Sequence, residues 1–155
     1  MNKLSLSIIT LLLVIIALGA YKFIFQGNTS NSDDSRIVIV LNPHEKDLIL
    51  KEMRDFLSAT QQIIQASADD EVIKVVAVAK KVGRIAQAEV PSTLVGKLPM
   101  AFKKLGFDTH TKFDELAQDA QDMEDKDQTL KLLAELMQNC VACHAAYRLD
   151  LEVTQ

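Results

Sequence analysis

The chain begins with one long apolar stretch, which runs from Leu4 to Phe25 and is interrupted by a single charge, Lys22. As a helix this stretch would extend about 33 Å, which is enough to cross a bilayer. Lys3 precedes it, and short basic flanks of apolar helices stay on the cytoplasmic side. The pattern therefore predicts that the rest of the chain is exported.

Two kinds of exported protein fit this stretch: one with an uncleaved signal anchor and one with a cleaved signal peptide. A signal peptide would use the apolar residues 8–16 and the small residues Ala17, Gly19 and Ala20 near its cleavage point. The apolar stretch continues past these residues to Phe25, which favours the anchor. Both place the remainder in the periplasm, and the anchor would hold it on the inner membrane.

A polar segment and a short apolar run follow. Residues 26–36 are small and polar, which predicts a flexible tether. The run Ile37–Leu41 could form a strand, but no partner strand is evident, so we interpret it as an extended segment packed on the domain. The chain thus divides into an anchor or signal peptide (1–25), a tether with an extended segment (26–41) and a globular domain (42–155).

Apolar residues recur at helical spacing through most of the globular domain. Four main helical segments are predicted: from Pro43 to about Ser67, from about Asp69 to Pro91, from Asp108 or Thr109 to an acidic turn at Asp122–Asp127, and from there to about Leu151. Asn42 is the expected N-cap of the first, and a short helix over 97–105, ended by Gly106, precedes the third. The pattern predicts an all-α fold, an antiparallel four-helix bundle preceded by the N-terminal hydrophobic helix.

Composition agrees with a helical fold and leaves room for a cofactor. The 155 residues include only 5 Gly and 3 Pro, which argues against a turn-rich β-sandwich. Aromatic residues are 5% and Trp is absent, so a cofactor could supply part of the core volume. The net charge is −4 and no basic block occurs, so nucleic acid is not an expected partner.

The only two cysteines are Cys140 and Cys143, and His144 follows directly. C-x-x-C-H is the attachment signature of c-type haem. Two thiols add to the two vinyl groups on one edge of the porphyrin, and the next residue offers an imidazole to the iron. On a helix His144 faces the same way as Cys140, four positions earlier, so it can be the proximal metal ligand. One covalent haem c is the expected cofactor.

Three other uses of a C-x-x-C pair fit less well. A thioredoxin-like redox pair should follow a strand within a βαβ pattern, whereas this motif lies late in a helical stretch. A zinc site would need four ligands, and His44 and His110 are isolated from the motif and from each other. A disulfide between positions i and i+3 of a helix has poor geometry.

A bundle with C-x-x-C-H near its C-terminus resembles class II cytochrome c, the cytochrome c′ group. The local match is the segment 140–148, C-V-A-C-H-A-A-Y-R, in which an aromatic and a basic residue follow the motif as they do in the family. The resemblance covers about residues 42–151. It implies that Cys140 and Cys143 bind the haem, that His144 is an axial ligand and that the haem packs among the first, third and fourth helices.

The sixth position of the iron is expected to face the first helix, as it does in this family. Low-spin members place a methionine there, and high-spin members place an apolar residue and leave the position empty. Met53 lies on the inward face of the predicted first helix, so it is the candidate second metal ligand. Thioether ligation would raise the potential and suit electron transfer. The alternative is that Met53 fills a gap in the core.

Two arginines are further candidates for contact with the haem. The resemblance assigns to Arg54 an ion pair with a propionate, and the alternative is a solvated surface side chain. Arg148, one turn after His144, could orient or shield the haem edge, and the alternative is a cation favoured by the end of the helix. His110 is expected to be a capping or surface residue.

Three functions are compatible with this cofactor. The chain could carry electrons in the periplasm, bind NO or CO at a vacant iron position, or hold haem as a membrane-tethered subunit of a larger complex. An enzyme is not expected, because no paired catalytic carboxylates and no Ser/His/Asp order stand out.

The expected partners are redox proteins. All 21 acidic residues follow Phe25, whereas two of the 17 basic residues precede it, so the exported part is acidic. An electrostatically steered partner would therefore present a basic patch. The alternative is that this charge only keeps the domain soluble. Many class II cytochromes are dimers through their first two helices, so a homodimer is a further expected assembly.

Overall fold

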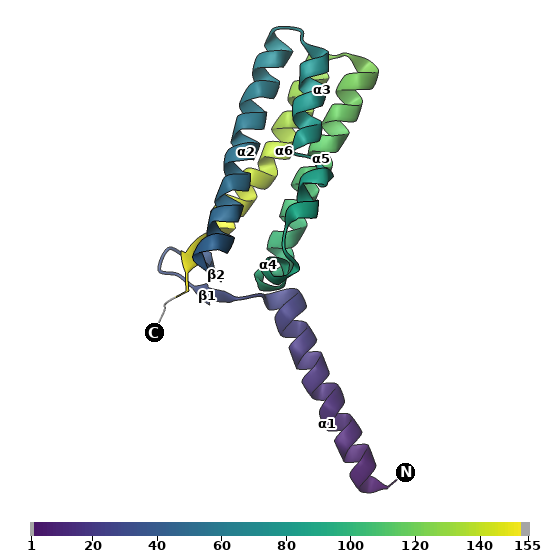
Figure 1. Ribbon diagram of the computed structural model, residues 1–155, viewed down its shortest axis with the longest axis vertical. Coiled ribbons are helices and arrows are strands. Elements are labelled where there is room, and N and C mark those ends of the chain that lie inside the picture. Colours follow the sequence, from purple (N-terminus) through teal and green to yellow (C-terminus); the bar gives the residue numbers. More distant parts are fainter. Residues whose placement is uncertain (1, 153–155) are drawn as a thin grey trace.

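The computed structural model describes residues 2–152, except for the side chain of Glu89, and these residues are mostly helical with a small sheet at one end (Figure 1). The expected predominance of helices is confirmed. The elements, in chain order, are α1 (Lys3–Ala20), the π-helix η1 (Tyr21–Gln26), β1 (Thr29–Asn31), β2 (Ile37–Leu41), α2 (Pro43–Ala68), α3 (Val72–Lys81), the 3₁₀-helix η2 (Arg84–Glu89), α4 (Ser92–Lys97), α5 (Met100–Met123), α6 (Lys126–Ala146) and β3 (Tyr147–Leu151).

Helix α1 and η1 form one continuous apolar rod that projects away from the rest of the molecule (Figure 1). The rod spans Lys3–Gln26, has a mean hydropathy of 2.5 and buries none of its side chains. It is long and apolar enough to cross a membrane, and a signal sequence passes the same test. The rod is therefore compatible both with an uncleaved signal anchor and with a cleaved signal peptide.

Helices α2, α3, α5 and α6 lie side by side and are called the helical body below (Figure 1). Asn42 caps α2 as predicted, because its side chain accepts the Glu45 amide hydrogen while Glu45 reaches back to the Asn42 amide. The core is aliphatic apart from Phe56 and Phe113, whose rings stack with centroids 5.5 Å apart. Other fully buried side chains are Ile63, Leu116 and Leu136.

The expected short helix over 97–105 is wrong. The chain forms α4 up to Lys97, turns at Leu98 and Pro99, and then continues as α5 without a break to Met123. Gly106 lies inside α5, where a side chain at its position would meet only open space. A single exposed glycine weakens a helix by about 1 kcal/mol relative to alanine, which does not end a helix with strong neighbours.

The sheet corrects two predictions made from the sequence. Ile37–Leu41 is extended as expected, but it has two partner strands: β1 pairs with it antiparallel and β3 pairs with it parallel, with Ile37 opposite Tyr147. The fourth helix therefore ends at Ala146 instead of reaching Leu151. Burial explains the change, because β2 places Ile39 and Leu41 in the core and β3 covers them.

The apolar rod is joined to the rest of the molecule through a tight contact with α4 and α5. Gly27 has a φ of 68°, and a Cβ at this position would collide with the backbone at Lys97. The Asn28 amide donates to the Lys97 carbonyl at 2.7 Å. The buried ammonium of Lys103 donates to the Ile24 carbonyl at 2.9 Å, at the C-terminal end of the rod, where the helix dipole favours a cation.

Candidate functional site

The cysteine motif lies in the last two turns of α6. Cys140 and Cys143 are free and half-buried, and His144 is exposed. The buried stripe of α6 passes through Leu133, Leu136 and Asn139 instead of His144. No residue among 2–152 forms a hydrogen bond with the His144 imidazole, so both of its ring nitrogens are open to a ligand.

Hydrogen bonds show which flank of α6 carries the motif. The Asn139 amide donates to Asp108 of α5 at 2.7 Å, so this side of α6 faces α5. Cys140 is the next residue and lies about 100° further around the helix, and His144 lies one turn beyond it. The other helix beside α6 is α2. Cys140 and His144 therefore lie on the flank of α6 toward α2.

Met53 reaches the same part of the helical body from α2. It is partly buried and packs against the apolar cluster at the sheet end of the body. Cys143 packs against this cluster too. The buried members of the cluster are Ile39, Leu41, Ile49, Leu94, Leu98 and Tyr147. The structure thus brings a thioether and one thiol of the motif to one apolar region, and ligation of iron by Met53 stays a prediction.

Exposed apolar side chains flank this region on both helices, and we call them the α2–α6 apolar surface. Its members are Leu50, Leu57 and Ile64 of α2 and Leu130, Met137 and Val141 of α6. Those of α2 recur every seven residues, which keeps them on one face of the helix. Leu57 is 72% and Ile64 47% exposed, so both point away from the core. Their position on neighbouring faces of two helices makes them a candidate binding surface.

The surroundings of the two thiols keep them protonated at neutral pH. Burial raises the pKa of Cys140. Burial, together with the neighbouring Cys140, raises the pKa of Cys143 to about 11. Redox-active C-x-x-C pairs have lowered pKa values, because the thiolate is the reacting species. Within residues 2–152 no group of three or more His, Cys, Asp or Glu side chains could hold a metal ion. The raised pKa values weigh against the thioredoxin-like alternative.

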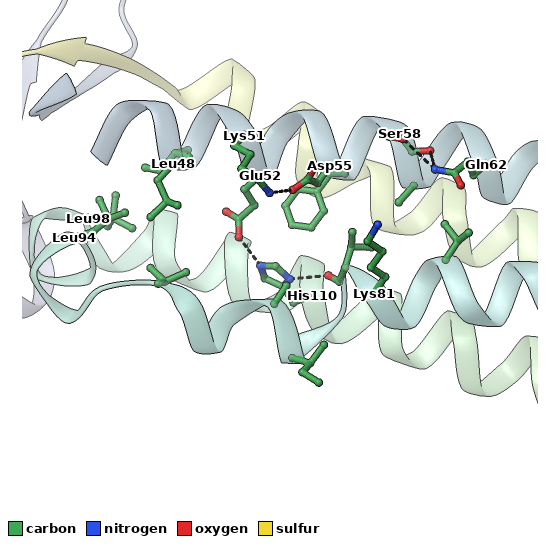
Figure 2. A pocket seen from close by; sticks show the side chains of 18 of the residues that line it. Leu48, Lys51, Glu52, Asp55, Ser58, Gln62, Lys81, Leu94, Leu98 and His110 are labelled. Atoms are coloured by element: carbon green, nitrogen blue, oxygen red, sulfur yellow. Dashed lines mark hydrogen bonds and ion pairs between the residues drawn. The ribbon is translucent and has the colours of Figure 1, made fainter. Parts of the chain in front are cut away.

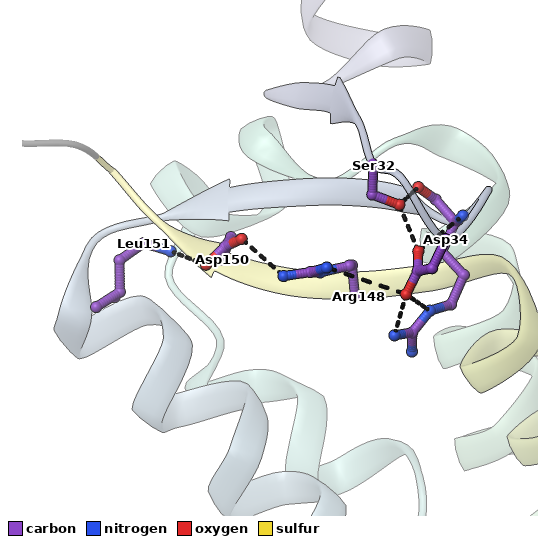
Figure 3. Close-up of polar contacts among 6 residues, drawn as sticks. Ser32, Asp34, Arg148, Asp150 and Leu151 are labelled. Carbon is purple, nitrogen blue, oxygen red and sulfur yellow. Dashed lines mark hydrogen bonds and ion pairs between the residues drawn. The ribbon is translucent and has the colours of Figure 1, made fainter.

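The two predicted arginines lie in different places. Arg54 is exposed on α2. Arg148 lies on β3 and not one helical turn after His144, so the helical position assumed for it is wrong. Its guanidinium donates to Asp150 at 3.0 Å and lies 4.0 Å from Asp34 (Figure 3). These carboxylates already balance its charge, and a contact of either arginine with haem stays a prediction.

A buried histidine is the residue that sequence reasoning missed. His110 is only 3% exposed, so its expected place at the surface or at a helix start is wrong. Its Nδ1 lies 2.7 Å from the Val82 carbonyl oxygen, and its Nε2 lies 3.1 Å from Glu52 Oε1 (Figure 2). The signal was helical spacing, because His110 precedes Phe113 and Ala117 on one stripe of α5. Beginning the helix at Asp108 concealed it.

His110 and Glu52 lie in a cleft of about 460 Å³ between α2 and the segment from α3 to α4 (Figure 2). Its walls are mainly apolar and include Phe56, Val82, Leu94, Leu98 and Phe102. Neither cysteine lines it. The cleft and the cysteine motif are thus two separate sites.

No model of a known protein family matches the chain, and neither a curated protein nor a solved structure matches it.

Proposed function

We propose that the chain is a monohaem c-type cytochrome that transfers electrons in the periplasm, built on an antiparallel four-helix bundle of the class II type. Cys140 and Cys143 would hold one haem c through thioether bonds, and His144 would ligate its iron. One observation carries the proposal: two free, half-buried thiols at the C-x-x-C spacing stand beside an exposed imidazole with no partner among residues 2–152.

The residues around the motif fit a large apolar ring. The α2–α6 apolar surface offers exposed Leu, Ile, Val and Met side chains on the flank that carries Cys140 and His144. Covering such side chains gains about 25 cal/mol per Å² of apolar area removed from water. A porphyrin attached at Cys140 and Cys143 is therefore a group of suitable shape and polarity.

Each residue has a separate task in this proposal. The bound haem would supply one-electron chemistry between ferrous and ferric iron. Cys140 and Cys143 fix its position, and His144 holds it from one side. Met53 is the candidate ligand from α2, and its apolar surroundings would keep water away. Electron transfer needs no acid–base pair at this site, so we propose a carrier and not an enzyme.

A second candidate function is binding of NO or CO at a vacant iron position. The observation that favours it is the packing of Met53 against both apolar clusters of the helical body. A methionine held by packing on two sides would not reach the iron, and the sixth position would then be open to a small gas. The reduced absorption spectrum separates the two functions, because six-coordinate low-spin haem has sharp α and β bands and five-coordinate haem has a broad one.

Covalent attachment is the first test. The full chain, the variant Cys140→Ala/Cys143→Ala and the control Met53→Leu are produced in cells that mature c-type cytochromes. Haem staining after denaturing electrophoresis should be positive for the full chain and the control and lost in the double variant. An unstained full chain, or haem that stays fixed without both thiols, would overturn the proposal.

A further inference from the structure

The cleft that holds His110 is a second site, on the flank of α2 away from the cysteine motif. Glu52 lines it, whereas Met53, the next residue, lies about 100° around the helix toward α6. A cleft of about 460 Å³ with mainly apolar walls is in the size range of small-molecule sites. Its wall residues also surround the contact between buried His110 and half-buried Glu52.

The hydrogen bonds of His110 and Glu52 place one proton on His110 Nδ1 and require a second proton between the two side chains. A carbonyl oxygen only accepts, so His110 Nδ1 donates its hydrogen to Val82. The contact between His110 Nε2 and Glu52 Oε1 then needs a second proton, carried by the imidazole or by the carboxyl group. Glu52 is thereby oriented, and its other oxygen, Oε2, accepts no hydrogen bond from residues 2–152.

The chemistry of the cleft selects the kind of ligand. Glu52 offers a hydrogen-bond acceptor inside the cleft, so the ligand must present a donor such as a hydroxyl group. An ionised fatty acid has only acceptors and would be repelled by Glu52. The rings of Phe56 and Phe102 line the walls, and aromatic side chains pack well against a flat ring. These features together describe an aromatic ring with a hydroxyl group, attached to an apolar body.

The position of the cleft indicates where such a molecule would come from. Leu94 and Leu98 form the wall at the α4 end, and α4 contacts the end of the apolar rod. The Phe23 ring lies beside Gly96 of α4, and Lys103 holds the Ile24 carbonyl. If the rod spans a membrane, this end of the cleft faces the lipid surface.

We infer that the cleft binds the ring of a membrane hydroquinone, whose hydroxyl group donates to Glu52. The apolar tail would leave past Leu94 and Leu98 toward the rod. Lys51, Asp55 and Lys81 line the same cleft from α2 and α3, so the polar groups there are of both signs and favour a neutral ligand. Binding at this cleft does not require the proposed haem.

The test is calorimetric titration of the full chain in neutral detergent, kept anaerobic with a reductant. The probe is a benzohydroquinone with a ten-carbon tail, compared with its oxidised quinone, with the same ring without the tail, and with laurate. Binding of the tailed hydroquinone should be at least tenfold tighter than binding of each of the three. The oxidised quinone has no hydroxyl group that could donate to Glu52. The tail-free ring lacks the apolar chain that would extend from the cleft toward the membrane.

Two variants locate the binding. Glu52→Gln should weaken hydroquinone binding about tenfold, because a neutral amide oxygen is a poorer acceptor. Ala86→Trp places a large side chain in the wall of the cleft and should abolish hydroquinone binding. Glu115→Gln, an exposed glutamate of α5, is the matched control and should bind as the unaltered chain does. Circular dichroism confirms that each variant keeps its helical content.

The outcomes separate this site from the proposed haem. Retained binding in Cys140→Ala/Cys143→Ala would support the cleft even if no haem is attached. Equal binding of laurate or of the quinone, or a Glu52→Gln variant indistinguishable from Glu115→Gln, would overturn the site. Equal binding of the tail-free ring would overturn its membrane source.

Discussion

At the scale of single residues, the environment of Cys143 has a direct chemical consequence. A pKa of about 11, caused by burial and by Cys140, leaves very little thiolate at pH 7.5. In protein produced without haem, iodoacetamide should therefore alkylate Cys143 at least about tenfold more slowly than it alkylates a free cysteine. Mass spectrometry of timed samples measures this. Urea should restore the full rate, and equal rates with and without urea would contradict the pKa.

The side chain of Met53 decides which of the two haem functions applies. If its sulfur is the sixth ligand, Met53→Leu should convert a low-spin spectrum to a high-spin one, lower the potential and admit CO. Met123→Leu, which alters an exposed methionine at the end of α5 remote from the motif, is the control and should change nothing. A high-spin spectrum in the unaltered chain would make Met53 a packing residue and favour gas binding. A variant spectrum identical to that of the unaltered chain would mean that another residue is the ligand.

The candidate site was only partly predictable from residues. Cys140, Cys143 and His144 are adjacent in the chain, so their joint chemistry could be predicted without knowing the fold. Met53 was found because one helix stripe contains it. His110 was missed because its pairing with Glu52 joins positions 58 residues apart, and burial of that kind depends on how α2, α3 and α5 pack.

At the scale of elements, the central strand β2 is a sensitive part of the fold. Ile39 is fully buried against α4 and α2, whereas Ile37, two residues earlier, is 41% exposed. Ile39→Ala should lower the free energy of unfolding by about 2–5 kcal/mol, and the matched variant Ile37→Ala by about 0.5 kcal/mol. Urea denaturation in detergent, followed by circular dichroism, measures both. Equal losses would mean that the sheet is not part of the core.

The contact between α2 and α5 through Glu52 and His110 makes stability depend on pH. Burial alone lowers the pKa of His110, but the hydrogen bonds to Glu52 and Val82 together raise it above its ordinary value. The protonated ring therefore stabilises the fold fully below pH about 6.5, and this contribution is lost as the pH rises through the raised pKa.

The predicted measurement is the free energy of unfolding by urea at pH 5.5 and at pH 8.5. It should fall with rising pH in the unaltered chain, and this dependence should be much smaller in His110→Phe. His44→Phe removes an exposed histidine and should keep the dependence. A dependence that survives in His110→Phe would assign it to another group.

Elements whose ends are set by neighbouring residues could be predicted from the sequence, whereas elements set by residues distant in the chain could not. The start of α2 was predictable because Asn42, Pro43 and Glu45 are neighbours and cap the helix locally. The end of α6 was not, because Tyr147–Leu151 alternates polar and apolar residues only over five positions. Its strand conformation comes from pairing with Ile37–Leu41, more than a hundred residues earlier.

At the scale of the whole molecule, charge and orientation bear on partner binding. The sheet, the last turn of α6 and the rod lie at one end of the helical body, and the turn between α5 and α6 lies at the other (Figure 1). The acidic turn predicted at Asp122–Asp127 is thus remote from the cysteine motif. A redox partner that docks near the motif would meet other parts of the acidic domain.

The expected behaviour is an association rate that falls as salt rises, because screening shortens the reach of charges to about 8 Å at physiological ionic strength. Stopped-flow reduction by a basic electron-transfer protein measures this rate. Asp122→Asn/Glu124→Gln, at the remote end, should change it little. A rate independent of salt would remove electrostatic steering from the account, and a large effect of the remote variant would move the docking face to that end.

The parallel pairing of β2 with β3 also sets an order of events during export. If the chain is exported as proposed, the segment that follows the apolar rod emerges first, so β2 leaves the membrane long before β3 and pairs with it only after this last strand has followed. Contacts between such distant segments form late in folding, because a long loop must close first. Cys140 and Cys143 precede β3, so under the same proposal they would reach the periplasm before the sheet can close their end of α6. An attachment reaction at these thiols can thus act on a still open chain.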